Sequence, residues 1–169
     1  DLHLDVPPTA HPLFQEQPLV AESRTRFGPG RPEGLGETLG ALAVGNVELY
    51  KETYGPLLME TITVPSPDCY NRDPGESCAD YSARMFAYME QALERHAGEV
   101  CAVILEPLIQ CAGSMRMYDP VYLSMLREAC DRHDVHIIAD EIAVGFGRTG
   151  TLFAYQQCGV VPDIMTVAK

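Results

Sequence analysis

Three residues that could do chemistry each close a short apolar run of the sequence. Glu106 ends VCAVILE, Asp140 ends VHIIAD, and Lys169 ends DIMTVAK. In an open parallel sheet, ligands bind at the carboxyl ends of the strands, so two carboxylates and an amine are expected to converge at one edge. An amine that follows an apolar run is held more easily in its neutral, nucleophilic form. The alternative is that all three residues only cap strands where the chain returns to water.

Strands and helices alternate along the part of the chain that carries these residues. The three apolar runs have strand length and are apolar almost throughout, which is typical of strands covered on both faces. Residues 79–96 repeat large apolar side chains at three- and four-residue steps, and Asp119 with Pro120 predicts the start of a second helix. Upstream, a helix after Gly36 and a strand at Thr61–Val64 are expected. This order predicts an α/β fold with a parallel sheet.

The overall composition restricts the class of partner. The chain has 169 residues, with 24 acidic against 12 basic side chains and a formal net charge of -12. Nucleic acids and anionic membrane surfaces select for basic patches, so we expect neither as a partner. No apolar run approaches the roughly 20 residues that a membrane-spanning helix needs. Small-molecule substrates or a protein partner are favoured.

The cysteines and histidines predict neither a disulfide framework nor a metal site. The six cysteines include no CxxC pair, and several lie in apolar runs, where a free thiol behaves as a small hydrophobe. We therefore expect reduced thiols and a cytoplasmic protein. His133 and His136 flank the start of a strand with no second group of metal ligands nearby, so no metal is expected.

Residues 1–35 differ in character from residues 36–169. The first segment holds six of the 13 prolines, which interrupt any helical or alternating period, so it is predicted to be an irregular leader. Residues 36–169 are predicted to form part of one larger domain. Because the sequence opens without Met and ends at Lys169, we expect a piece of a longer protein.

The block ADEIAVGFGRTGTLFAYQQCGVVPDIMTVAK, residues 139–169, resembles the signature of the class III pyridoxal-phosphate-dependent aminotransferases. The resemblance implies that Asp140 bonds the pyridine nitrogen of pyridoxal 5'-phosphate and that Ile142 packs on its ring. It also implies that Lys169 is the Schiff-base lysine and the catalytic residue, moving a proton between the substrate Cα and the cofactor. The implied fold is part of the large domain of the fold type I, aspartate aminotransferase-like transferases, truncated at that lysine.

A second block, EPLIQCAGSMRMYDPVYL, resembles the EP-x-x-Q segment of the same family. The resemblance places Glu106 and Gln110 near the cofactor, although Cys111 stands where glycine is usual. Tyr118 and Arg116 are conceivable substrate contacts, but packing or surface roles are favoured for them.

The RMYDPVYL string and Ala143 are most similar to the branch of the family that works in biotin synthesis. This implies transfer of an amino group from S-adenosylmethionine to 8-amino-7-oxononanoate by a cytoplasmic homodimer, with no nucleic-acid or membrane partner. One alternative is another class III aminotransferase that uses an ω-amino acid and pyruvate. The other is a truncated, non-catalytic remnant, and the chain is expected to be inactive alone in either case.

Two features qualify the resemblance. GETLGAL, residues 36–42, resembles a family segment that is preceded by an aromatic pair, but Gly34 and Leu35 stand there instead. The phosphate-binding residues are also expected to lie outside this chain.

In the Gly-rich turn GFGRTG, Arg148 is predicted to fasten the loop by hydrogen bonds to carbonyl oxygens rather than to act in catalysis.

Overall fold

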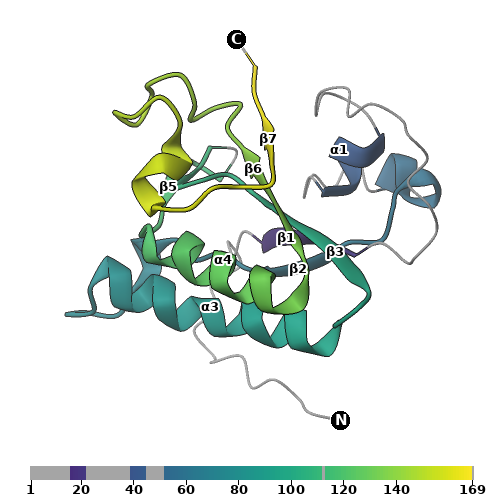
Figure 1. Cartoon of the computed structure of the whole chain (residues 1–169), viewed down its shortest axis with the longest axis horizontal. Helices are drawn as coiled ribbons and strands as arrows, with labels where there is room; N and C mark the ends of the chain where they lie inside the picture. The colour runs from purple at the N-terminus through teal and green to yellow at the C-terminus, as the bar shows by residue number, and fades with distance from the viewer. Residues whose placement is uncertain (1–15, 22–38, 45–51, 112, 169) are drawn as a thin grey trace.

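A five-stranded sheet with two long helices on one face forms the centre of the molecule (Figure 1). The computed structural model describes residues 16–21, 39–44, 52–111 and 113–168. The strand order is β2-β1-β3-β6-β7, in which β3, β6 and β7 run parallel and β1 is antiparallel to β2 and β3. The strands span Glu16–Ala21 (β1), Ile62–Pro65 (β2), Val100–Leu105 (β3), His136–Asp140 (β6) and Ile164–Thr166 (β7).

The predicted βαβ arrangement is confirmed, and it aligns the ends of the strands. The chain leaves β3, passes through α4 (Val121–His133) and returns as β6, with Leu105 paired to Ala139. The next crossover contains η3 (Ala154–Cys158), a 3-10 helix, and leads to β7. Parallel strands in this register carry the residues that follow them to one edge of the sheet.

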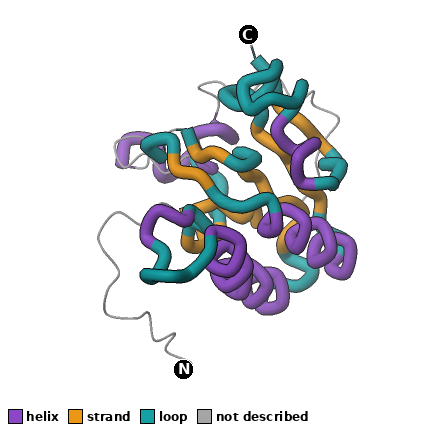
Figure 2. Tube along the Cα trace, turned by 90° about the vertical axis from the view of Figure 1, so that its left-hand side faces the viewer, coloured by secondary structure: helices purple, strands orange, loops and turns teal. Residues whose placement is uncertain are grey.

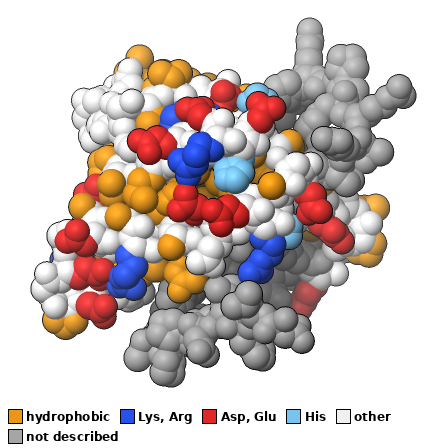
Figure 3. Space-filling view, turned by 60° about the horizontal axis from the view of Figure 1, so that its bottom comes forward, with side chains coloured by type: hydrophobic (Ala, Val, Ile, Leu, Met, Phe, Trp, Pro, Cys, Tyr) orange, Lys and Arg blue, Asp and Glu red, His pale blue; other side chains and the backbone are white. Residues whose placement is uncertain are grey.

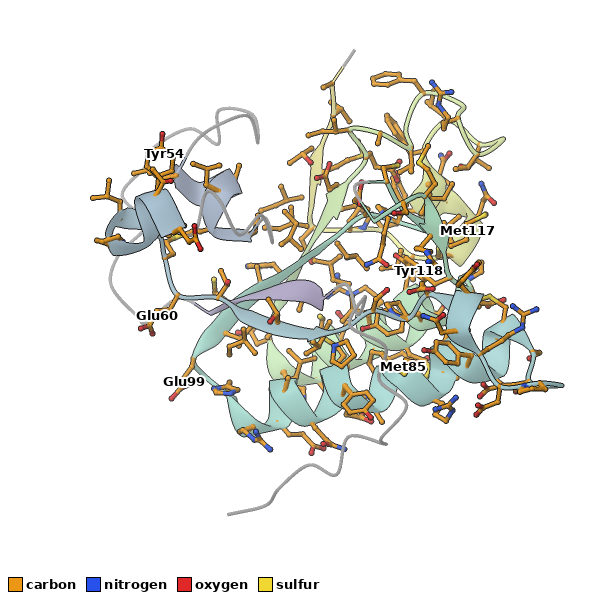
Figure 4. The ribbon with its side chains drawn as sticks, turned by 180° about the vertical axis from the view of Figure 1, so that it is seen from behind. Tyr54, Glu60, Met85, Glu99, Met117 and Tyr118 are labelled. Carbon is orange, nitrogen blue, oxygen red and sulfur yellow. A yellow bond between two sulfur atoms is a disulfide. The ribbon has the colours of Figure 1, made fainter. Side chains whose placement is uncertain are left out.

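The helices α3 (Cys78–Arg95) and α4 pack together on one side of the strands (Figure 2). The Ser77 hydroxyl caps α3 by accepting from the Asp80 amide at 3.1 Å, and Asp119 accepts from the Val121 amide at 3.0 Å at the start of α4. Met85 lies on the sheet-facing side of α3 (Figure 4). Burying a Met or Leu side chain stabilises a fold by roughly 1.5–3 kcal/mol, so this shared apolar layer holds both helices. Its fully buried members include Phe86, Met89, Leu93, Tyr122, Leu123 and Leu126.

The opposite faces of these helices are charged. Arg132 pairs with Glu90 at 2.6 Å, which links α4 to α3 across their outer surface. Figure 3 shows acidic and basic side chains interspersed on this side of the molecule. Exposed ion pairs contribute little to stability, so the apolar layer beneath them decides the packing.

Smaller elements surround the sheet. A two-stranded hairpin, β4 (Ile109–Gln110) with β5 (Arg116–Met117), follows β3. Short helical segments lie at α1 (Leu39–Val44), η1 (Gly55–Leu57) and η2 (Cys69–Asn71). The helix expected after Gly36 and the strand expected at Thr61–Val64 are therefore present as α1 and β2. Across the described ranges, no helix is both long and apolar enough to cross a membrane, and no cluster of potential metal ligands occurs.

The prediction of irregular structure throughout residues 1–35 is wrong for residues 16–21, which form β1. Because of the high proline content, the sequence pattern did not predict this strand. Proline lacks an amide hydrogen and is tolerated where a strand is not paired on both sides. Pro18 is paired with Thr63 of β2 only, and pairing with β3 begins at Leu19.

The prediction that all six cysteines are reduced is also wrong, because Cys69 and Cys78 form a disulfide. Their Cα atoms are 5.1 Å apart, since the turn that contains η2 folds back to the first residue of α3. Sequence spacing alone gave no sign of this approach. The cysteines outside this disulfide are Cys101, Cys111, Cys130 and Cys158.

Candidate active site

Glu106 and Asp140 lie at the same edge of the sheet. Leu105 and Ala139 are register partners on the adjacent parallel strands β3 and β6, and the two acidic residues come directly after them. On its other side, Asp140 is the register partner of Thr166 in β7. The predicted convergence of the two carboxylates is thus found.

Asp140 is half-buried and held by two hydrogen bonds to one of its carboxylate oxygens. Oδ1 accepts from the Ile142 amide at 3.1 Å and from the Thr166 hydroxyl at 3.1 Å. Within the described part of the chain, neither a hydrogen bond to Oδ2 nor an ion pair to this carboxylate is present. The side chain is therefore oriented through its Oδ1 atom.

Glu106 occupies a less polar position beside Asp140. Burial, and then the negative charge of Asp140, raise the pKa of the Glu106 carboxyl to about 7. Its Oε2 accepts from the Cys111 amide at 2.9 Å, which opposes the rise only in part. At neutral pH Glu106 therefore exists in both protonation states and can donate or accept a hydrogen bond.

The β4–β5 hairpin supports the backbone at Glu106. The Tyr118 hydroxyl, directly after β5, donates to the Glu106 carbonyl oxygen at 2.7 Å. Figure 4 shows Tyr118 beside Met117 at the end of the sheet away from Tyr54. Gln110 is buried, and its Oε1 accepts from the buried Ser66 hydroxyl. This bond fixes the orientation of the Gln110 amide, while Tyr118 takes the packing role that was favoured for it.

Glu141 is a residue of the site region that the sequence reasoning missed. Its side chain is fully buried, and its two carboxylate oxygens accept from the Ala154 and Tyr155 amides, each at 2.9 Å. These bonds fasten the loop after β6 to the start of η3. A carboxylate inside an otherwise apolar stretch was the available signal, since a buried charge needs partners.

The loop after Asp140 is also closely packed around its backbone. The Gly145 amide donates to the Glu141 carbonyl oxygen at 2.8 Å. A Cβ atom on Gly145 would lie 2.8 Å from that same oxygen, so the loop needs glycine there. Arg148, which was predicted to fasten the loop, has an exposed side chain, and its guanidinium donates to no carbonyl in the described ranges. Glu141 fastens the loop instead.

The remaining predicted site residues divide into two groups. Ile142 is half-buried directly after the Asp140–Glu141 pair, with its amide bonded to Asp140. Lys169 lies outside the described residues, as does the segment 34–38, which includes Gly34 and Leu35. The structure therefore brings together Glu106, Asp140 and Ile142, with Gln110 on the adjacent hairpin.

Comparison with known proteins identifies the family. A family model described as aminotransferase class-III matches residues 35–169. The chain belongs to the class III aminotransferases. The Helicobacter pylori adenosylmethionine-8-amino-7-oxononanoate aminotransferase is 47% identical over 134 residues, which cover 79% of this chain and 29% of that protein. The chain thus spans less than a third of the length of this curated relative.

Solved transaminase structures give the fold. An omega-transaminase from Thermomicrobium roseum has a TM-score of 0.68 at 35% identity, and the match covers 78% of this chain and 30% of that one. An omega transaminase from Pseudomonas jessenii in complex with PMP has a TM-score of 0.66 at 29% identity, covering 79% and 30%. The described elements are accordingly part of a fold type I transferase domain, and proteins of this family depend on pyridoxal phosphate.

Proposed function

We propose that this chain is part of the cofactor-binding domain of an aminotransferase that moves an amino group from S-adenosylmethionine to 8-amino-7-oxononanoate in biotin synthesis. The observation that carries the proposal is the 47% identity to the Helicobacter pylori protein of that name. A cytoplasmic homodimer acting on a small-molecule donor and acceptor belongs to the same proposal.

The residues at the sheet edge suit pyridoxal phosphate. A protonated pyridine nitrogen needs an anionic acceptor, and Asp140 has an oriented carboxylate with one oxygen unbonded in the described part of the chain. When bound, the cofactor supplies an electron sink for the charge that leaves the substrate Cα. In this proposal Asp140 keeps the ring nitrogen protonated, and the apolar side chain of Ile142 packs on the ring.

Three further residues have proposed roles toward the cofactor. Lys169 holds the cofactor covalently and carries the proton to and from the substrate Cα, as the family motif implies. Glu106, whose pKa is raised to about 7, stays partly neutral beside Asp140, so the edge does not carry two full negative charges. Gln110, fixed by Ser66, offers its amide hydrogens from the hairpin.

A second candidate is an ω-amino-acid aminotransferase that uses pyruvate, because the omega-transaminase from Thermomicrobium roseum is 35% identical. To separate the two, residues 35–169 would replace the matching segment of the Helicobacter pylori relative. The chimera is assayed with S-adenosylmethionine and 8-amino-7-oxononanoate, and separately with an ω-amino acid and pyruvate. We expect turnover with the first pair. A chimera that folds, binds cofactor and turns over only the second pair would overturn the proposal.

A further inference from the structure

The disulfide between Cys69 and Cys78 closes a short ring on the side of the molecule that faces the β4–β5 hairpin. It joins η2 to the first residue of α3 across nine positions of sequence. The 5.1 Å between the two Cα atoms lies within the range that disulfides require. The separation of the two Cα atoms is therefore compatible with the bond.

Hydrogen bonds within the turn supplement the bond between the two sulfur atoms. Arg72 donates to the Cys69 carbonyl oxygen at 2.9 Å and to the Glu76 carbonyl oxygen at 3.1 Å. Glu76 in turn accepts from the Asp73 amide at 3.1 Å and from Arg84 at 2.9 Å. We expect these bonds to keep the two cysteines within reach of each other after reduction, while the turn is held less firmly than in the oxidised form.

The two cysteine residues differ in exposure. Cys69 is buried at 4% exposure, whereas Cys78 is half-buried at the helix start. A reductant is therefore expected to attack the Cys78 sulfur and to release Cys69 as the leaving thiolate. After protonation, the Cys69 thiol has acceptors within reach, since its Sγ is 3.6 Å from both the Cys78 carbonyl oxygen and the Ser82 hydroxyl.

The neighbours of Cys69 connect the ring to the hairpin. The Tyr70 amide donates to Asp68 at 3.0 Å, and the centre of the Tyr70 ring lies 3.6 Å from the Arg116 guanidinium carbon. Arg116 also lies 3.9 Å from the Asp68 carboxylate and pairs with Gln110 across the hairpin. Through these contacts with Arg116, a bond that holds residues 68–70 in place also restrains β5.

We propose that Cys69 and Cys78 form a reversible thiol–disulfide exchange site for a dithiol reductant, and that its closure fastens η2 onto the β4–β5 hairpin. One thiolate of the reductant attacks Cys78, giving a mixed disulfide and the Cys69 thiolate. The second thiol of the reductant then displaces Cys78. In total the reductant loses two electrons and two protons and becomes a disulfide, while the pair gains both and becomes two thiols.

The test follows the 169-residue chain in dithiothreitol redox buffers of graded potential. Alkylation and peptide mass measurement at each potential report which cysteines are free, and amide hydrogen exchange reports on Tyr70 and residues 116–117. We expect Cys69 and Cys78 to change state together and these amides to exchange several-fold faster in the reduced chain, with the helix amides unchanged.

Variants separate this site from the other cysteines. The double substitution Cys69→Ser, Cys78→Ser should exchange like the reduced chain at every potential, whereas Cys130→Ala should keep the full response. If the pair stays reduced in excess oxidised dithiothreitol, no exchange site exists. If the pair oxidises but the hairpin amides exchange at the same rate in both states, the coupling to the hairpin is wrong. Both results come from the unmodified chain and do not depend on the variants folding.

Discussion

Asp140 and Glu106 lie side by side but have different surroundings. Asp140 receives hydrogen bonds on one oxygen from Ile142 and Thr166, while Glu106 is hydrogen-bonded to Cys111. Burial then raises the pKa of Glu106, with a further contribution from the charge of Asp140. Adjacent carboxylates whose environments differ in this way are suited to different tasks.

In the chimera that carries residues 35–169, Asp140→Asn should retain some cofactor but lose several orders of magnitude in turnover. A neutral amide does not hold the ring nitrogen as a cation, so the electron sink is weakened. Turnover and the absorbance of bound cofactor are measured together, with Asp134→Asn, in the exposed turn after α4, as the control. A rate near that of the unsubstituted chimera would remove Asp140 from this role.

Glu106→Gln should stabilise the chain above pH 7 and have little effect near pH 4. The folded-state pKa of about 7 exceeds the ordinary 4.5, so stability falls as pH rises between these values and the penalty is complete above the upper one. After discounting for partial exposure, the gain at pH 8 is about 1 to 2 kcal/mol. Urea unfolding at both pH values measures it, with Glu128→Gln, an exposed position of α4, as control. An equal gain at both pH values would contradict this cause.

Tyr122→Phe should stabilise the fold by about 1 kcal/mol, because it removes a buried polar group without a partner. The Tyr122 hydroxyl makes no hydrogen bond in the described structure, although its ring packs edge to face on Phe86 at 5.4 Å. Tyr118→Phe is the matched control and should destabilise, since the Tyr118 hydroxyl donates to the Glu106 carbonyl. Denaturant midpoints compare them, and a loss of stability in Tyr122→Phe would reveal a partner for its hydroxyl.

At the scale of elements, the periodicity of apolar residues predicted the helices and strands that local sequence determines. The helix expected at residues 79–96 is α3, the runs ending at Glu106 and Asp140 are β3 and β6, and the last strand is β7. The elements that were not predicted are short or depend on their pairing partners. β1 is defined by its partners rather than by its proline-containing sequence, and the β4–β5 hairpin has only two residues in each strand.

In the candidate site, too, some features could be predicted from the sequence and others could not. Strand ends were enough to predict that Glu106 and Asp140 lie at one edge, because a parallel sheet aligns the residues that follow its strands. The roles of these two residues and of Ile142 toward a cofactor stay predictions. The sequence could signal that Glu141 needs partners but not which ones, since these are the amides of Ala154 and Tyr155 in η3, 13 and 14 residues further along the chain. The Cys69–Cys78 bond likewise depends on how one turn folds back.

Gly145→Ala should destabilise the loop after β6 by about 1–3 kcal/mol, the usual cost of forcing an extra atom into a packed site. The new Cβ would meet a backbone oxygen of Glu141 at 2.8 Å, which cannot move without breaking the loop's hydrogen bonds. Gly55→Ala is the control, because no atom lies within 4 Å of the corresponding position. Urea unfolding of both variants measures the difference, and equal stabilities would show that the loop is not closely packed.

At the scale of the whole molecule, the 169-residue chain alone should not catalyse amino transfer, even with excess pyridoxal phosphate. It spans only 29% of its Helicobacter pylori relative, and catalysis requires that the reacting groups are all fixed in place. Transfer from several amino donors is followed with a bovine serum albumin blank. Turnover well above the blank would show that this segment already holds the complete machinery.

The edge position of β7 has a consequence for handling this protein in solution. In the described sheet β7 pairs only with β6, and its successive residues Ile164 and Met165 are 44% and 37% exposed on opposite faces. An apolar strand with unpaired backbone groups is a template for edge-to-edge aggregation. The chain on its own is therefore expected to attract chaperones and to precipitate at high concentration, starting from β7.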